Sequence, residues 1–306
     1  MALPRKRLCS SSMTSGIQEH IRAFSRYTDM SKPSEKHIVT DTVKAQDGRI
    51  VASQNEVRVL RALNRFGWLP TKSLAALLWQ PWLRKPAGEP DMQPRLPTAS
   101  GRLMAQRTLR RLYLARQVLR AQAPDGSLIY ALAEAGVRRL TQLGVPASSG
   151  KDLVRRFSSA QFRHRSIANE IAISGIVAGF RVSTEREVAI NKWLGGENGI
   201  AGKKPDVLIQ SNGQVWWIEV EKSRRKASDR AKLHDFLQQV YQDASRAEGP
   251  MLLGGLRWAK VIFICTPAFR TRLVRELGTA GWHEATISRL TSFMDALYSF
   301  EDIAFK

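Results

Sequence analysis

Apolar residues first recur at helical spacing between residues 53 and 78. Their positions in the first helix are Val57, Leu60 and Leu63. Ser53 and Glu56 match a capping box, in which two side chains satisfy free amides at a helix start, so we expect the helix to begin there. Gly67 is expected to end it. A second short helix is predicted from Thr71, as its N-cap, through Leu78.

The next segment combines a proline-rich stretch, a third helix and a hairpin. Five prolines within residues 80–98 exclude regular structure and predict an inserted loop. A third helix is predicted over residues 100–116. Its expected core residues are Leu109, Leu112 and Tyr113. Runs 118–122 and 128–132 flank a Pro-Asp-Gly turn and predict a hairpin, and a closing helix over 134–143 precedes Gly144. Three helices followed by a hairpin are typical of a winged helix.

The second half alternates between helical and extended patterns. A hairpin is predicted within residues 203–222, where two apolar runs flank a Ser-Asn-Gly turn. The other expected elements are a helix over 155–178 before Gly179, a strand over 180–190, a helix near 228–247, a strand over 259–265 and a helix over 268–278. The order of helix, three strands, helix and strand predicts an α/β core with a central sheet.

Charge narrows the class of partner. The formal charge is +21, and +14 of it falls in residues 1–150, which hold 24 basic and 10 acidic residues. Such an excess attracts polyanions, and nucleic acid is the first expectation. A basic membrane-surface protein is the alternative, but no long apolar span or secretory segment is visible. Cys9 and Cys265 provide no disulfide framework, and no zinc-ligand spacing occurs. We therefore expect a cytoplasmic protein that binds nucleic acid.

The basic residues of the third helix are candidates for DNA contact. No acid occurs over the 33 positions between Asp91 and Asp125. We expect this helix to enter a major groove, with the hairpin along the backbone and with binding that weakens as salt rises. The candidate DNA-binding residues are Arg102, Arg107, Arg110, Arg111 and Arg116. The alternative is a solvated basic helix in a winged module used for protein pairing. Recognition of a palindromic DNA site by a homodimer is the ordinary expectation for a winged module.

The hairpin within residues 203–222 carries the candidate chemistry. Side chains alternate along a strand, so Trp217, Glu219 and Glu221 are expected on one face. The other face is expected to hold Trp216, Ile218 and Val220. Neighbouring carboxylates repel each other, and a divalent cation that bridges them to Asp206 on the adjacent strand would offset this. The alternative is an exposed face of solvated acids. Trp217, beside the acids, is a candidate for stacking on a base.

This pattern resembles the active site of the PD-(D/E)xK nuclease superfamily, in which the Asp of a Pro-Asp pair and the first acid of an acidic-x-Lys triplet hold the metal. Pro205-Asp206 and Glu219-Val220-Glu221 match, but Glu221 replaces the usual Lys, and Lys222 points to the opposite face. The resemblance implies a restriction-endonuclease-like core that holds Mg²⁺ or Mn²⁺ at Asp206 and Glu219. Glu221 would accept a proton from water or bind a second ion. The missing Lys leaves catalysis open.

Further residues acquire roles from this resemblance. Glu170 lies on the leading helix, where several resolvase-like members place a metal ligand; the alternative is a surface residue paired with an Arg. His164 is expected to orient a phosphate or to make an ordinary polar contact. Glu185 and Glu187 would face the same cleft from the first strand, or form salt bridges. The residues expected to clamp the scissile backbone, or to solvate a helix start, are Arg224, Arg225 and Lys226.

The layout of the whole chain looks like the replication-relaxation family of plasmids and integrative elements. The matching features are Leu132-Ala-Glu-Ala-Gly136 at the end of the winged module, His164, Lys204-Pro205-Asp206 and Glu219-Val220-Glu221. Together they cover about residues 53–245. The resemblance implies DNA binding in replication or mobilisation, alongside other replication or mobilisation proteins. It also implies that this cytoplasmic protein is associated with nucleoid or plasmid DNA.

These patterns predict an α+β chain with two domains and a mixed central sheet in the second. The expected divisions are a flexible basic leader (1–50), a winged-helix DNA-binding domain (51–145), a PD-(D/E)xK nuclease-like domain (152–280) and a C-terminal extension packed on that core (281–306). Two functions remain open. One is a metal-dependent DNA endonuclease or nickase. The other is a non-catalytic DNA-binding accessory factor or transcription regulator with a degenerate nuclease fold.

Overall fold

The computed structural model describes residues 47–155, 159–221, 226–246 and 252–298. Within these ranges the chain is α+β, with a three-stranded antiparallel sheet and a five-stranded mixed sheet. Residues 1–46 of the expected leader lie outside the described residues, and its last three belong to the first described helix. None of the helices in the described ranges is long and apolar enough to cross a bilayer.

The first half folds in the predicted order of helices and hairpin. Its elements are α2 (Gly48–Phe66), β1 (Trp68–Pro70), α3 (Thr71–Leu78), α4 (Ala99–Leu114), β2 (Val118–Gln122), β3 (Leu128–Leu132) and α5 (Glu134–Gln142). The strand order β1-β3-β2 adds one strand to the expected hairpin, because β1 pairs with β3. Gly67 and Gly144 follow α2 and α5 with φ of 85° and 73°, a conformation that favours glycine. Both predicted helix ends are therefore confirmed.

The start of α2 differs from the prediction. The helix begins at Gly48, and the Asp47 side chain caps it by accepting a hydrogen bond from the Arg49 amide. Ser53 and Glu56 lie inside the helix, where Glu56 pairs with Arg111 and with Arg139 of α5. The predicted capping box is wrong because these two side chains bind other elements. Thr71 is the first residue of α3 and provides no side-chain cap, since Pro70 holds the N-cap position.

The proline-rich segment between α3 and α4 is irregular, as predicted, but it packs closely on the second half of the chain. The Leu83 amide donates to the Val177 carbonyl. Met92 is buried, and its carbonyl accepts a hydrogen bond of 3.0 Å from the Tyr298 hydroxyl. This segment therefore joins regions that are far apart in sequence. Trp82, by contrast, leaves half of its surface exposed.

The second half builds the five-stranded sheet. Its elements are α6 (Lys151–Arg155), α7 (Ser159–Val177), β4 (Arg181–Ser183), α8 (Glu185–Ala189), β5 (Val207–Ser211), β6 (Gln214–Glu221), α9 (Ala227–Ala244), β7 (Arg257–Cys265), α10 (Pro267–Thr279), α11 (Glu284–Leu290) and β8 (Thr291–Met294). The strand order is β4-β5-β6-β7-β8. The first three strands run antiparallel in turn, and β7 and β8 are parallel to β6. Residues after the predicted core thus supply the fifth strand.

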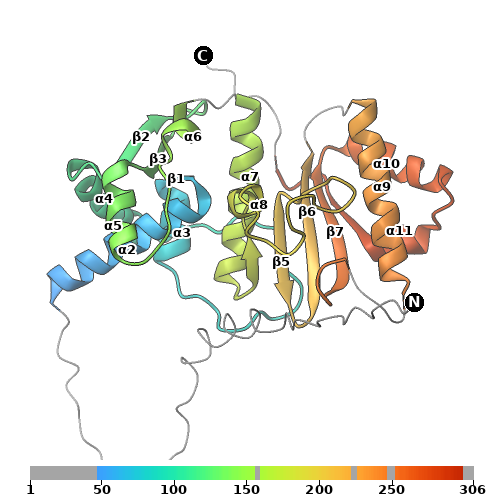
Figure 1. Ribbon diagram of the computed structural model, residues 1–306, viewed down its shortest axis with the longest axis horizontal. Coiled ribbons are helices and arrows are strands. Elements are labelled where there is room, and N and C mark those ends of the chain that lie inside the picture. Colours follow the sequence, from blue (N-terminus) through green and yellow to red (C-terminus); the bar gives the residue numbers. More distant parts are fainter. Residues whose placement is uncertain (1–46, 156–158, 222–225, 247–251, 299–306) are drawn as a thin grey trace, which may run out of the picture. The chain divides into compact units, whose positions relative to one another are not determined.

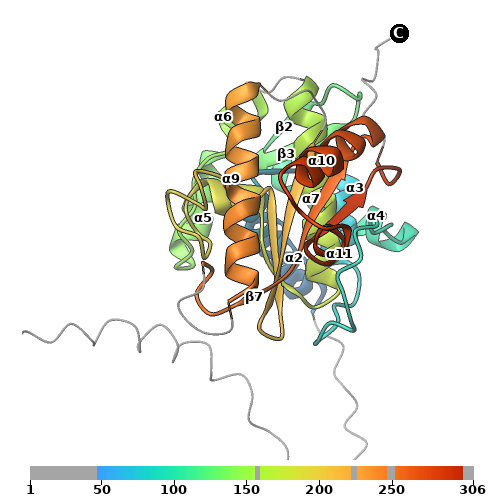
Figure 2. The same ribbon diagram turned by 90° about the vertical axis from the view of Figure 1, so that its right-hand side faces the viewer.

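The two faces of this sheet belong to different hydrophobic cores. Trp216, Ile218 and Val220 of β6 pack with α7, whereas Trp217 packs with α9. The predicted alternation along β6 is therefore confirmed. Figure 1 shows α7 on one side of the strands and α9 on the other. Figure 2 looks onto the second side, with α9 and α10 in front of the sheet.

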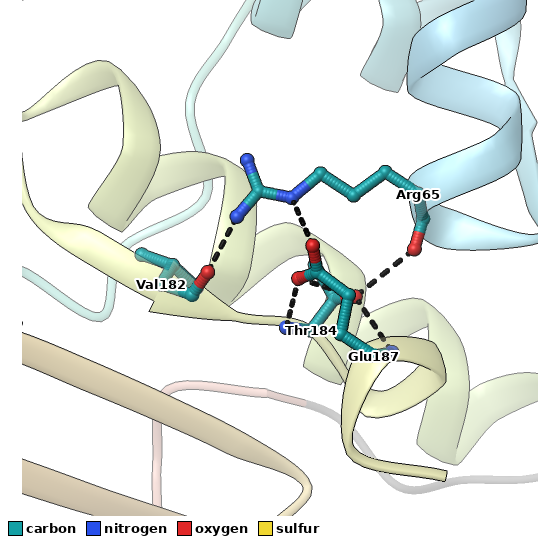
Figure 3. A network of polar contacts seen from close by, with 4 residues as sticks. All are labelled: Arg65, Val182, Thr184 and Glu187. Carbon is teal, nitrogen blue, oxygen red and sulfur yellow. Dashed lines mark hydrogen bonds and ion pairs between the residues drawn. The ribbon is translucent and has the colours of Figure 1, made fainter. Parts of the chain in front are cut away.

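The expected strand over residues 180–190 is wrong beyond Ser183. Strand β4 is short, and Thr184 begins helix α8 with a complete capping box, in which its hydroxyl and the Glu187 carboxylate satisfy each other's backbone amides. Glu187 also accepts from Arg65 of α2 at 3.0 Å, and the same guanidinium donates to the Val182 carbonyl. Figure 3 shows this network, which joins the end of α2 to the edge of the larger sheet.

Candidate functional site

Asp206 lies immediately before the first residue of β5, beside the middle of β6. Its backbone amide donates to the Ile218 carbonyl at 3.0 Å, and its Oδ2 accepts from the Val220 amide at 2.7 Å. The Asp206 carboxylate therefore accepts a hydrogen bond from β6 that a backbone carbonyl would accept within the sheet, at the point where β5 begins. This geometry places the acid of the Pro-Asp pair next to the strand that carries Glu219, as the hairpin pattern predicts.

His164 of α7 forms the second contact of Asp206. Its Nε2 lies 3.2 Å from Asp206 Oδ2, and both side chains are less than one third exposed. Burial by itself lowers the pKa of His164, but the charge and hydrogen bond of Asp206 outweigh it, and Glu185 and Glu219 add to the effect. The pKa of His164 rises to about 9. Burial opposes ionisation of Asp206, yet His164, the Val220 amide and Lys203 lower its pKa. At neutral pH the two groups form a charged pair.

Glu219 is buried, and its polar partners include Lys203 and Trp217. Lys203, from the loop before β5, places its Nζ 2.8 Å from Glu219 Oε2, with 9% and 4% of the two side chains exposed. Trp217 donates its indole N–H to Glu219 Oε1 at 2.7 Å. Trp217 is fully buried and lies against Phe236 of α9. It therefore has no surface on which a base could stack, and that expectation is wrong.

Glu221 lies on the same strand face as Glu219, and it is also buried. It pairs in register with Cys265 of β7. Cys265 is a buried strand residue, as its apolar run indicates, and burial raises the pKa of its thiol to about 12. The solvated acidic face considered as an alternative does not exist, because both glutamates are enclosed. Buried carboxylates need cations or hydrogen-bond donors, and Lys203 and Trp217 supply both to Glu219.

A second ion pair lies next to His164 and Asp206. Arg165, the neighbour of His164 on α7, lies 2.9 Å from the carboxylate of Glu185. Burial raises the pKa of Glu185, Asp206 raises it further, and Arg165 and His164 oppose both. Glu185 lies on α8, not on a strand, but it still carries its charge close to Asp206. Glu187 faces Arg65 instead, so these two glutamates form the salt bridges considered as the alternative.

Glu170, the third predicted metal ligand, points elsewhere. Its carboxylate lies 3.0 Å from Lys72 of α3 and lines a cavity between α3, the β2–β3 turn and α7. Six residues separate it from His164, which places the two side chains about 120° apart around the helix. Asp206 and Glu219 both act on the charge of His164, whereas the described contacts place Glu170 beside Lys72 instead.

The donor atoms at Asp206 and Glu219 suit a hard divalent cation, because carboxylate oxygens are its preferred ligands. Each acid is, however, already paired with a nitrogen cation of the chain, His164 or Lys203. Among the described residues, no group of three or more His, Cys, Asp or Glu side chains has the arrangement to hold a metal ion. Binding at this pair would therefore require Lys203 to move away from Glu219.

The predicted DNA-binding residues occupy two regions. Arg102, Arg107 and Arg110 are exposed on α4, and Arg116 follows the helix with φ of 55°. Arg111 is also exposed, but it pairs with Glu56 at 2.9 Å, which ties α4 to α2. Tyr113 was expected in the core. It is 42% exposed instead, and the Arg120 guanidinium of β2 lies 4.8 Å from the centre of its ring.

The basic cluster after β6 is only partly visible. Arg224 and Arg225 lie outside the described residues, and Lys226 is exposed at the N-cap position of α9.

Lys203 and Arg165 are the polar residues that sequence reasoning did not assign. A signal for Lys203 existed, because it precedes Pro205-Asp206 by two residues and extended backbone could carry it toward the next strand.

Comparison with known proteins adds no assignment. No protein-family model, no curated protein and no solved structure matches the chain. The geometry of the described residues therefore supplies the evidence for function.

Proposed function

We propose that this chain binds duplex DNA through the unit from α2 to β3, acting as a winged helix, and serves in processing plasmid or mobile-element DNA. The observation that carries the proposal is the exposed face of α4. Arg102, Arg107 and Arg110 fall within about 140° of the helix circumference, opposite its buried residues. Leu103 and Leu114, exposed by 53% and 72%, lie between them.

Such a face combines phosphate contacts with apolar surface for base edges. Guanidinium groups bind phosphates and guanines through paired hydrogen bonds, and apolar side chains contact thymine methyl groups. Arg111 is excluded from this role in our proposal because Glu56 already engages it. Arg120 lies on β2 of the hairpin, with its guanidinium against the Tyr113 ring. It would contact the sugar-phosphate backbone of the DNA beside the major groove.

Salt-dependent binding tests this assignment. In fluorescence anisotropy with labelled duplexes, changing Arg107→Gln together with Arg110→Gln should weaken binding and reduce the slope of log K against log salt by about 0.9 for each phosphate that the variant no longer neutralises. Arg275→Gln, an exposed residue on α10, is the matched control for charge. Equal affinity and slope in the double variant would exclude α4 as the docking helix.

The second part of the proposal concerns the five-stranded sheet, which we interpret as a restriction-endonuclease-like core. The order of α7, β4, β5, β6, α9 and β7 and the meeting of Asp206 with the Glu219 strand support this reading. Asp206 and Glu219 would hold Mg²⁺ or Mn²⁺, which would polarise a phosphate and lower the pKa of a bound water. Lys203 would then supply, from another loop, the positive charge that position 221 lacks.

Phosphodiester cleavage is directly testable. Supercoiled plasmid should be nicked with Mg²⁺ or Mn²⁺ and not with EDTA, and Asp206→Asn or Glu219→Gln should abolish nicking while duplex affinity stays unchanged. Full nicking by both variants would show that the activity belongs to another site or to a contaminant.

A non-catalytic DNA-binding accessory factor is the second candidate. The observation that favours it is the pairing of both acids within the chain: His164 neutralises Asp206, and Lys203 neutralises Glu219. A site completed in this way needs no metal for stability. This candidate predicts normal duplex binding and no cleavage with either metal. In calorimetry with Mg²⁺ or Mn²⁺, the native chain and Asp206→Asn should give the same heat.

A further inference from the structure

A cavity of about 460 Å³ lies along α2, between this helix, the end of α3 and the proline-rich segment. Three arginines, Arg58, Arg61 and Arg65, line it from one side. The apolar lining includes Phe66, Leu77 and Leu78, and Trp82 closes the row. None of the described residues that line it is acidic. A groove with a basic wall and an apolar floor suits an anion that carries a flat apolar group.

This groove faces away from the proposed duplex-binding helix. Glu56 marks the side of α2 that is turned toward α4 and α5, through its pairs with Arg111 and Arg139. Arg65 lies nine residues further along, which is about two and a half turns and therefore the opposite side of the helix. The arginine row and the exposed face of α4 are thus separate surfaces.

Two of the three guanidinium groups are held in place. Arg58 donates to the Leu78 carbonyl and to Asn55, and Arg65 donates to Glu187 and to the Val182 carbonyl. In Figure 3 the second terminal nitrogen of Arg65 points away from those acceptors. Arg61 is exposed and has no hydrogen-bond or ion-pair partner among the described residues. The row therefore combines two fixed charges with one cation that is available to a ligand.

Trp82 is an aromatic surface held by a hydrogen bond. Its indole N–H donates to the Leu77 carbonyl at 2.6 Å, while 50% of the residue stays exposed. An exposed tryptophan fixed at one edge keeps an open ring face and loses little conformational freedom when a flat group stacks on it. Bases stack on such rings regardless of sequence, because every base has a π-face.

We propose that this groove binds an unpaired nucleotide, with the base on Trp82 and the phosphate at Arg61. The ligand is either a nucleotide of single-stranded DNA or a free nucleotide, since both present a flat base and an anionic phosphate. The site would hold a displaced or frayed strand while α4 grips the adjoining duplex. The groove does not depend on duplex binding, so the two assignments stand or fall separately.

The test measures anisotropy of a short fluorescein-labelled oligothymidylate with the full chain. Trp82→Leu, which keeps an apolar side chain, should weaken binding roughly tenfold, in the range found for loss of one base–aromatic stack. Arg61→Gln should reduce the salt slope by about 0.7, the value for one single-strand phosphate. Arg275→Gln, with the same loss of charge on α10, should change neither quantity.

Competition by thymidine monophosphate separates the two sources. If thymidine monophosphate displaces the oligonucleotide from the native chain but not from Trp82→Leu, the groove is a free-nucleotide site. If the oligonucleotide binds and thymidine monophosphate does not displace it, the groove is a site for a single strand. The proposal is overturned if the wild-type chain binds neither ligand, or if Arg61→Gln and Arg275→Gln have equal effects. Arg107→Gln with Arg110→Gln should reduce duplex binding and spare the oligothymidylate, which separates failure of this site from failure of the α4 assignment.

Discussion

The pair of His164 and Asp206 makes a quantitative prediction about pH. Replacing His164 by Gln retains a donor for the Asp206 carboxylate and removes the positive charge. In the native chain the pKa of His164 rises from 6.5 to about 9, despite burial, because Asp206, Glu185 and Glu219 surround it with negative charge. A pKa of the folded state above that of the unfolded state means that protonation stabilises the fold.

The magnitude follows from the size of the shift. Each pKa unit corresponds to about 1.36 kcal/mol, so His164 should contribute about 3 kcal/mol to the free energy of unfolding. The contribution is fully present below pH 6.5 and is lost as the pH rises through 9, because the folded state then releases the proton that it held more tightly. The side chains of the pair are 29% and 19% exposed, so solvent screening weakens the effect only partly.

Urea denaturation at a series of pH values between 5 and 10 measures this directly. The difference between wild type and His164→Gln should shrink across the window by about 3 kcal/mol, and taking the difference removes groups that titrate in both proteins. An NMR titration of the His164 ring should give a midpoint near 9. A constant difference across the window, or a midpoint near 6.5, would refute the charged pair.

Three further predictions concern other contacts of the chain. Lys203→Met or Glu219→Gln alone should lower the free energy of unfolding, measured with denaturant, by about 3 kcal/mol or more, because each leaves a buried charge unpaired. The double variant should recover most of that loss, and additive losses would contradict the ion pair. Arg65→Met should lower the free energy of unfolding by about 2 kcal/mol because it removes the hydrogen bonds to Glu187 and a carbonyl, and an unchanged urea midpoint would show that this junction contributes nothing. In a Cys9→Ser background, the Cys265 thiol, with its pKa raised to about 12 by burial, should react with a disulfide reagent only as fast as the chain unfolds, and rapid labelling of the folded protein would exclude the burial.

Local patterns of the sequence predicted most of the elements. Period-two alternation placed Trp216 and Trp217 on opposite faces of one strand, and the structure assigns them to different cores. Glycines marked helix ends because their left-handed backbone conformation is cheap only without a Cβ, as Gly67 and Gly144 show. These features depend on residues close in sequence, which is why sequence reasoning recovers them.

One pattern gave two different outcomes. Ser53-Gln-Asn-Glu56 and Thr184-Glu185-Arg186-Glu187 both have the spacing of a capping box. Only the second caps a helix, and it ends β4 where a longer strand was expected. The first fails because Asp47 starts the helix earlier and arginines of α4 and α5 engage Glu56. The spacing shows what the side chains can do, and tertiary partners decide whether they do it.

The acid pair shows the same limit at the functional site. The sequence placed Asp206 and Glu219 beside each other in one hairpin, but their partners, His164 and Lys203, come from outside that hairpin. Lys203 had a local signal in its position two residues before Pro205, whereas no local pattern encodes the approach of His164 from α7. Because Lys203 occupies Glu219, a divalent ion must displace an ammonium group from a buried carboxylate before it can bind both acids. The free energy of that exchange, and not the presence of the carboxylates, separates a nuclease from a DNA-binding scaffold. Lys203→Met should therefore strengthen metal binding at this pair in calorimetry if the acids form a metal site. If the sheet is only a scaffold, the same variant should lose stability without binding metal.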